Sequence, residues 1–298
     1  MRSMVHARPK ANPQRSDPRQ RAPQAPITGN LIAKSLPEDF EAAYQAIASD
    51  PKYNHFVNIP ARIIRCLDYF GIAGDRELIR GRLQSYYLFI GVVDNAIDSG
   101  QIGIGARVLN CLNTQVPMFD GNSRDCRVKL ITEVLKHHIS DDCYPLIIDK
   151  FEELYQEVLR ERAARSIDAY IDRRRTIGFL TAELSYLLIC PLLKSNGVEM
   201  CNFMKEVGAV GCLVDSIIDL RSDHRLGLLG FEPALSNYAK LIVLTMRLGL
   251  RLVVSYPGLG RIFFEAIVDN FRDRISRDQL SHGRGMVSDR KDQATGVA

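Results

Sequence analysis

An apolar run that carries two aspartates reads Leu88-Phe-Ile-Gly-Val-Val-Asp-Asn-Ala-Ile-Asp98. Its carboxylates, Asp94 and Asp98, are four residues apart, which on an α-helix places them one turn apart on the same face. Like charges at this spacing repel each other, and charge set into a core-facing helix costs free energy unless it is paired or binds a metal. The run therefore predicts a core-facing helix whose two aspartates have a functional role.

A second apolar run repeats this pattern in Val210-Gly-Cys-Leu-Val-Asp-Ser-Ile-Ile-Asp219, and Asp223 follows after one more turn. Magnesium prefers hard oxygen ligands and usually keeps waters and substrate phosphates in its coordination shell. Carboxylates one helical turn apart can share such ions, and the ions neutralise a diphosphate as its C–O bond breaks. The predicted magnesium ligands are Asp94, Asp98, Asp215, Asp219 and Asp223. The predicted catalytic residues are Asp94, Asp98, Asp219 and Asp223.

Aspartate pairs at this spacing also occur elsewhere in the chain, so spacing alone is a weak signal. The sequence has 22 aspartates and five pairs separated by four residues. Two of the pairs, Asp168/Asp172 and Asp269/Asp273, lie among arginines and are predicted to form ordinary salt bridges on solvated faces. The remaining three pairs are embedded in apolar sequence, and this separates them from the background.

Three glycines interrupt the same apolar helices. Gly91, Gly208 and Gly211 each cost about 1 kcal/mol relative to alanine inside a helix. A glycine in such a position indicates either close helix packing or room for a ligand. Both interpretations are compatible with a cavity.

The hydrophobic pattern is helical almost throughout, and few stretches alternate in the way that strands require. Asp75 is a plausible N-cap for a long helix that ends at Ser99-Gly100. The fold class expected is all-α, a single helical domain over residues 31–280. Its helices are predicted at Leu31–Ser49, Pro60–Phe70, Asp75–Asp98, 102–113, 124–138, 142–161, 164–190, 197–221, 232–254 and 258–279.

The two ends of the chain have a different composition. Residues 1–30 are rich in Pro, Arg, Gln and Ala, with Asp17 as the only acid, and are predicted to be a disordered arm. An arginine-rich, acid-poor leader is also typical of an organelle transit peptide, so organelle targeting stays open. Residues 281–298 are predicted to be a disordered polar tail.

Composition excludes several classes of function. The 298 residues are 46% hydrophobic and 25% charged, as in globular proteins. The net charge of +4 lies partly in the first thirty residues, which argues against a nucleic-acid partner. Seven scattered cysteines without a CxxC indicate reduced thiols and a cytoplasmic protein. No apolar run reaches the roughly 18–20 residues of a transmembrane segment, although an apolar substrate could bring the protein to a membrane surface.

The two aspartate-rich elements resemble those of the squalene/phytoene synthase branch of the class I isoprenoid synthases. In that family each element has the form DxxxD on an apolar helix, matched here by Asp94-Asn-Ala-Ile-Asp98 and Asp219-Leu-Arg-Ser-Asp223. The resemblance covers roughly residues 35–280, but only the two motifs are specific. It implies a helical bundle around a central apolar cavity, magnesium as cofactor (three ions) and a prenyl diphosphate as substrate. A homodimer is compatible with it.

The chain departs from that family in ways that bear on the reaction. Ile90-Gly91 stands where an arginine commonly precedes the first motif, and Asn95 replaces a frequent second aspartate. The Tyr-rich, Gly-rich helix that helps those enzymes join two substrates has no recognisable match. These departures favour a terpene synthase, which ionises one prenyl diphosphate and then cyclises or eliminates. The alternatives are a head-to-head prenyltransferase of squalene/phytoene synthase type and a non-catalytic helical isoprenoid-binding protein. The DDxxD and NSE pair of ordinary terpene cyclases is also absent.

Such a site also needs cations and an apolar wall. The guanidinium fork suits phosphate oxygens, and aromatic rings can stabilise a carbocation. The predicted diphosphate-binding residues are Arg174, Arg221 and Arg225. The predicted pocket residues are Tyr87, Phe89, Phe179 and Tyr186. Each aromatic could equally be an ordinary core residue, and the arginine run at 173–175 could pair with Asp168 and Asp172.

Overall fold

The computed structural model describes residues 38–101, 103–114 and 126–268. The described residues are mostly helical and contain no β-strand, which confirms the all-α prediction. The predicted arm 1–30, the predicted tail 281–298 and the pair Asp269/Asp273 lie outside the described residues. The α-helices are α1 (Glu38–Ala48), α2 (Asn54–Tyr69), α3 (Arg76–Asp98), α4 (Ile104–Thr114), α5 (Cys126–His138), α6 (Tyr144–Arg162), α7 (Ile167–Ile189), α8 (Val198–Arg225) and α9 (Leu235–Ser255), followed by a helix over 260–268.

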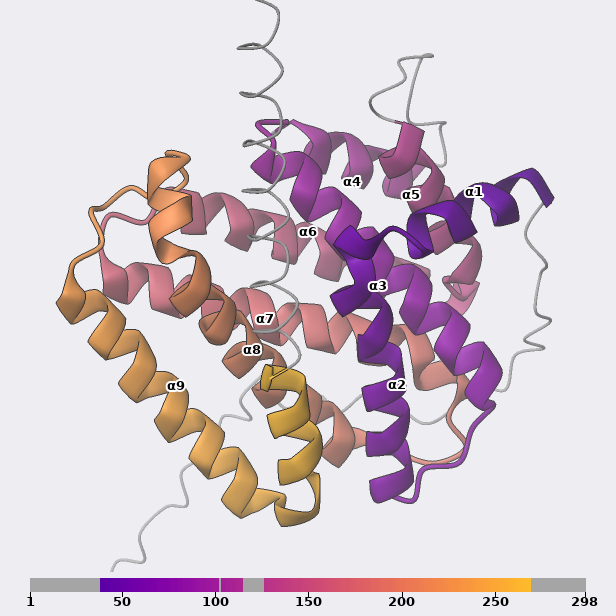
Figure 1. Cartoon of the computed structure of the whole chain (residues 1–298). Coiled ribbons are helices and arrows are strands. Elements are labelled where there is room, and N and C mark those ends of the chain that lie inside the picture. Colours follow the sequence, from indigo (N-terminus) through magenta and orange to yellow (C-terminus); the bar gives the residue numbers. More distant parts are fainter. Residues whose placement is uncertain (1–37, 102, 115–125, 269–298) are drawn as a thin grey trace, which may run out of the picture.

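Helices α7 and α8 form the centre of the bundle. α7 packs along α8 and α6, α3 packs against α2 and α5, and α9 packs against α8. Figure 1 shows α2 and α3 on one side of α7 and α9 along the opposite edge of the molecule. The side chains that fill the interior are aliphatic and aromatic, with Tyr86, Tyr170 and Tyr186 among the largest that are fully buried.

The local signals at α3 act as predicted. The Asp75 side chain accepts hydrogen bonds from the backbone N–H groups of Glu77 and Leu78, each at 3.1 Å, which caps the helix. The helix ends at Ser99, and Gly100 follows with φ of +90°, a conformation that favours glycine. These two ends fix the helix so that Asp94 and Asp98 lie in its last two turns.

Two predicted helices have different bounds in the structure. The helix expected from Pro60 begins at Asn54, because Pro60 lies inside α2 rather than at its first turn. The helix expected to end near residue 221 continues to Arg225, and Gly227 closes it with φ of +71°. The extra turn matters because it places Asp223 on the same helix as Asp215 and Asp219.

The glycines in the apolar helices separate into two kinds. Gly178 of α7 and Gly208 of α8 meet backbone to backbone: a Cβ at position 178 would lie 2.2 Å from the carbonyl oxygen of Gly208. A Cβ at Gly91 would lie 2.5 Å from the ring of Phe56. Gly211 is different, because nothing lies within 4 Å of the place where its Cβ would be. Close packing therefore explains why glycine stands at positions 91 and 208. Gly211 instead borders open space.

Alanine at position 178 is expected to lower the free energy of unfolding by about 1–3 kcal/mol, because the added methyl group must push two helix backbones apart. Urea unfolding followed by circular dichroism measures this. The matched control is Gly81→Ala in α3, where a Cβ meets nothing within 4 Å and the change is expected to stabilise by up to about 1 kcal/mol. Equal effects of the two substitutions would contradict the close approach of α7 and α8.

The described residues contain no clear transmembrane segment. The segment Ile167–Leu192 is long and apolar enough to cross a membrane, but 61% of its apolar window is buried inside the protein. This segment contains α7, the central helix of the bundle, and most of its apolar side chains pack inside the protein. Among the described residues, the one further candidate is a bent pair, Leu235–Ser255 with Pro257–Val268, which meets the same criterion only when the two are taken together.

Candidate active site

A cavity of about 360 Å³ lies between α2, α3, α7, α8 and the helix over 260–268. Much of its wall is apolar, as expected of a pocket for a hydrocarbon. The apolar lining includes Phe56, Ile63, Ile90, Ile177, Val207 and Phe263. All five predicted aspartates also line it. The cavity therefore combines a hydrocarbon-like wall with a group of acids contributed by two helices.

Asp94 is held where a negative charge is costly. The pKa of its carboxyl is raised from 3.8 to about 7, first because surrounding protein replaces bulk water and then because the charge of Asp98 is close. Asp215 of α8 adds to this effect, and the guanidinium of Arg174 opposes it. The side chain nonetheless remains accessible to solvent, because it faces the cavity. Asp94 can therefore be reached by a ligand that supplies positive charge.

Asp223 shows the same behaviour from the opposite wall. Its pKa is raised from 3.8 to about 7, by removal from water and then by the charge of Asp219 one turn away. Asp98 of α3 also raises it, and Arg174 lowers it. Charges on α3 and on α8 thus influence each other across the cavity, which means that the two aspartate-rich helices face one another.

These two shifts give the metal-free protein a defined pH dependence. The folded pKa values lie above those of unfolded aspartate, so the folded state holds two protons up to about pH 7 that the unfolded state has already lost. This contribution to stability is fully present at low pH and is lost as the pH rises through about 7. Relative to Asp94→Asn/Asp223→Asn, the wild type is therefore expected to become less stable as the pH rises. Urea unfolding between about pH 5 and 8 in the presence of a chelator tests this, and a difference that stays constant would contradict it.

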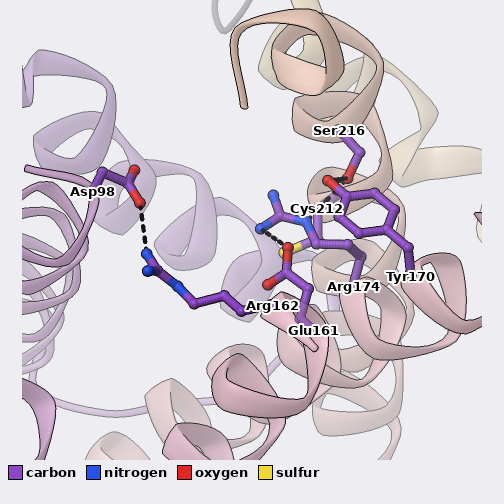
Figure 2. A network of polar contacts seen from close by, with 7 residues as sticks. All are labelled: Asp98, Glu161, Arg162, Tyr170, Arg174, Cys212 and Ser216. Atoms are coloured by element: carbon purple, nitrogen blue, oxygen red, sulfur yellow. Dashed lines mark hydrogen bonds and ion pairs between the residues drawn. The ribbon is translucent and has the colours of Figure 1, made fainter. Parts of the chain in front are cut away.

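A network of polar contacts from α6, α7 and α8 holds Arg174 in the cavity wall (Figure 2). Its Nη1 lies 3.6 Å from Oε1 of Glu161, and its Nε donates a hydrogen bond to Oγ of Ser216 at 3.0 Å. The hydroxyl of Tyr170 donates to the same Ser216 oxygen at 3.3 Å. The side chain of Arg174 is only 21% exposed. A guanidinium fixed in this way is preorganised to meet an anion in the cavity.

A second arginine connects α6 to the first aspartate motif. Nη2 of Arg162 lies 3.4 Å from Oδ1 of Asp98, so this contact joins the end of α6 to the end of α3 (Figure 2). Glu161 precedes it in the chain, and loss of water around the Glu161 carboxyl raises its pKa, while Arg174 and Arg162 lower it. The charged lining thus combines acids from α3, α6 and α8 with arginines from α2, α6 and α7, namely Arg62, Arg162 and Arg174.

Some of the predicted site residues lie at the cavity and others do not. The five aspartates, Arg174 and Tyr87 line it. The other predicted residues do not line it: Arg221 and Arg225 are exposed outside the cavity, Phe89 packs against Phe151, Phe179 is 40% exposed beside Lys205, and Tyr186 is buried against Gly197.

Helical phase explains why some of these side chains lie away from the cavity. Cavity-lining residues of α8 include Gly211, Asp215, Asp219 and Asp223, which recur about every four residues on one face. Arg221 lies two residues after Asp219, so it points away from that face. Phe89 is displaced in the same way from Tyr87 on α3. Nearness in the sequence to a motif does not place a side chain at the site.

Glu161 and Arg162 also line the cavity, and the sequence did not single them out. They stand in the run Arg160-Glu-Arg162 at the end of α6, which is typical of a solvated helix end. Only the tertiary packing of α6 on α7 brings them to the cavity. For the arginine run at 173–175, the alternative interpretation is pairing with Asp168 and Asp172. In the structure, Asp168 is paired with Lys240 instead.

The donor set fits magnesium by its chemistry. Five carboxylates on two facing helices offer hard oxygen ligands, and the raised pKa values of Asp94 and Asp223 indicate a deficit of positive charge. Within the described residues, no three His, Cys, Asp or Glu side chains are placed so that they could hold an ion by themselves. Proteins usually bind magnesium through one or two carboxylates together with substrate phosphates and water.

Comparisons with protein-family models, with curated proteins and with solved structures find no match for this chain. What the cavity does has to be inferred from its own residues and their geometry. The relevant features are the facing aspartates, the fixed arginine and the apolar wall.

Proposed function

We propose that this protein is a magnesium-dependent class I terpene synthase that ionises one allylic prenyl diphosphate. The observation that carries the proposal is the meeting of Asp94 and Asp98 on α3 with Asp215, Asp219 and Asp223 on α8 around an otherwise largely apolar cavity. Acids in facing pairs suit a metal-bound diphosphate, and the apolar wall suits a prenyl chain. Few other ligands need both in one cavity.

Each part of the lining has a distinct role in this proposal. The aspartates would hold the magnesium ions, which when bound stabilise negative charge on the diphosphate. Arg174 would bind a diphosphate oxygen and orient the group, since the contacts with Glu161 and Ser216 fix its direction. The C–O bond then breaks with its electron pair leaving on the diphosphate oxygen. The apolar wall excludes water, so the allylic cation closes a ring or loses a proton instead of being captured as an alcohol.

The size of the cavity favours one prenyl chain over two. About 360 Å³ is at the lower end of the range of roughly 300–1,000 Å³ for small-molecule sites. A head-to-head prenyltransferase has to enclose two chains at once. The cyclising or eliminating reaction is therefore the preferred proposal. The prenyltransferase is the alternative, and analysis of the products distinguishes the two.

The test is incubation of the purified protein with C10, C15 and C20 prenyl diphosphates, with magnesium or with a chelator, followed by mass analysis of the products. A magnesium-dependent product with the carbon number of its substrate is the expected result. A doubled carbon number would instead establish the prenyltransferase. Release of no diphosphate from any substrate would overturn both enzymatic proposals and leave the isoprenoid-binding protein, which calorimetry with a non-hydrolysable prenyl diphosphate analogue would then detect.

A further inference from the structure

Helix α9 presents a broad apolar face to solvent. Met246 is 69% exposed, Leu250 66% and Val254 73%, whereas Leu241 and Leu252 on the opposite face are buried. The further exposed apolar side chains of α9 are Leu235, Ile242, Val243 and Val253. A monomeric soluble protein rarely exposes so many neighbouring apolar side chains, and such a face is typical of a surface that binds a protein or a membrane.

The charges of α9 indicate what kind of partner it is. Its sequence contains Lys240, Arg247 and Arg251 and no aspartate or glutamate. Arg247 and Arg251 follow Val243 at intervals of four residues, so they line one edge of the apolar face. In the part of the chain that the structure describes, no carboxylate forms an ion pair with either arginine. An apolar face bordered by arginines is the arrangement of a helix that lies in the interface of an anionic lipid membrane.

The charges also disfavour a second copy of the chain as the partner. Pairing α9 with α9 of another copy would bring basic residues together without any acidic residue of that helix to offset them. Anionic lipid headgroups, in contrast, supply the missing negative charge along the whole helix.

The helix that follows α9 also exposes a large apolar side chain. After α9 the chain bends by 115°, and Phe264 of the following helix is 67% exposed. The other face of this helix reaches inward, where Ile262, Phe263 and Ile267 line the cavity. One short helix thus separates the exposed apolar face from the cavity. Figure 1 shows this helix turning back from the end of α9 towards α2.

We propose that α9 and the outer face of 260–268 form a docking surface for an anionic membrane, with α9 lying in the plane of the lipid headgroups. Met246, Leu250, Val254 and Phe264 would enter the acyl boundary while Arg247 and Arg251 reach the headgroups. Docking itself does not rest on the proposed function, because it follows from surface residues alone. If the cavity does bind a prenyl diphosphate, docking also brings one wall of the cavity next to the lipid in which the prenyl chain dissolves.

The experiment is co-flotation of the full chain with unilamellar vesicles, in the absence of any prenyl diphosphate. One set of vesicles is phosphatidylcholine alone, and the other is an equimolar mixture with phosphatidylglycerol. We expect binding to the anionic vesicles. Met246→Gln/Leu250→Gln is expected to weaken it about a hundredfold, since two apolar side chains no longer gain from burial. Arg247→Gln/Arg251→Gln is expected to weaken it about thirtyfold, and the remaining binding should no longer distinguish the two vesicles.

The matched control is Leu146→Gln, which removes a 46% exposed leucine from α6 and should bind vesicles as the wild type does. Circular dichroism verifies that every variant is folded. The proposal is overturned if the wild type does not float with anionic vesicles, or if the α9 variants bind as tightly as it does. Sedimentation equilibrium tests a second copy of the chain as the competing partner. If the wild type is a dimer, Met246→Gln/Leu250→Gln dissociates it and neither protein binds vesicles, this face is assigned to a second copy.

Discussion

Asparagine in place of Asp94 is expected to lower kcat for diphosphate release at least about a thousandfold, because one of the acids that would hold magnesium loses its charge. Loss of metal-based stabilisation of a leaving group costs several kcal/mol in the transition state, and each 1.36 kcal/mol is a factor of ten. Asparagine has nearly the same shape, so the apolar cavity and the fold are retained. Steady-state kinetics at saturating magnesium measures the effect.

The same substitution is expected to stabilise the metal-free protein above about pH 7, which a purely structural role would not do. The Asp94 carboxylate is disfavoured by its surroundings and by Asp98, so a neutral side chain relieves both. A variant that is more stable and yet inactive is the signature of a functional acid. Asp172→Asn is the matched control, since Asp172 is exposed on α7 outside the cavity lining, and its activity should equal that of the wild type. Wild-type turnover by Asp94→Asn would remove Asp94 from the reaction.

The sequence predicted the fold and the acidic part of the site, because both depend on local periodicity. Aspartates four residues apart in apolar helices must share a face wherever those helices pack. The length of α3 followed from its cap at Asp75 and its glycine end. That α3 and α8 face each other could only be expected from the resemblance, and it is supported by the mutual influence of Asp98 and Asp223 on their charges.

Of the basic and aromatic residues predicted for the site, only Arg174 and Tyr87 line the cavity. Arg221 and Phe179 were chosen for their nearness in the chain to a motif, but each points away from the cavity face of its helix. Glu161 and Arg162 were missed because nothing in a charged helix end indicates what it packs against. These positions depend on contacts between α6 and α7, which carry no short-range sequence pattern.

Glutamine in place of Arg174 has the other large expected effect. Its guanidinium is held in the cavity wall by Glu161 and Ser216, with the hydroxyl of Tyr170 behind Ser216. Removal of one preorganised charged donor to a developing anion usually costs about a hundredfold to a thousandfold in kcat. We expect a loss in this range for Arg174→Gln, together with weaker binding of inorganic pyrophosphate by calorimetry.

The variant is also expected to be less stable than the wild type, and this effect has to be separated from catalysis. Without Arg174, the partly buried Glu161 carboxylate loses its closest described cation, which costs roughly 1–3 kcal/mol for a pair of this exposure. Adding Glu161→Gln removes the uncompensated charge, so the double variant should regain most of the stability. It should not regain activity or pyrophosphate affinity, because the guanidinium that meets the anion is still missing. Recovery of activity along with stability would mean that Arg174 acts only by holding α6 and α7 together.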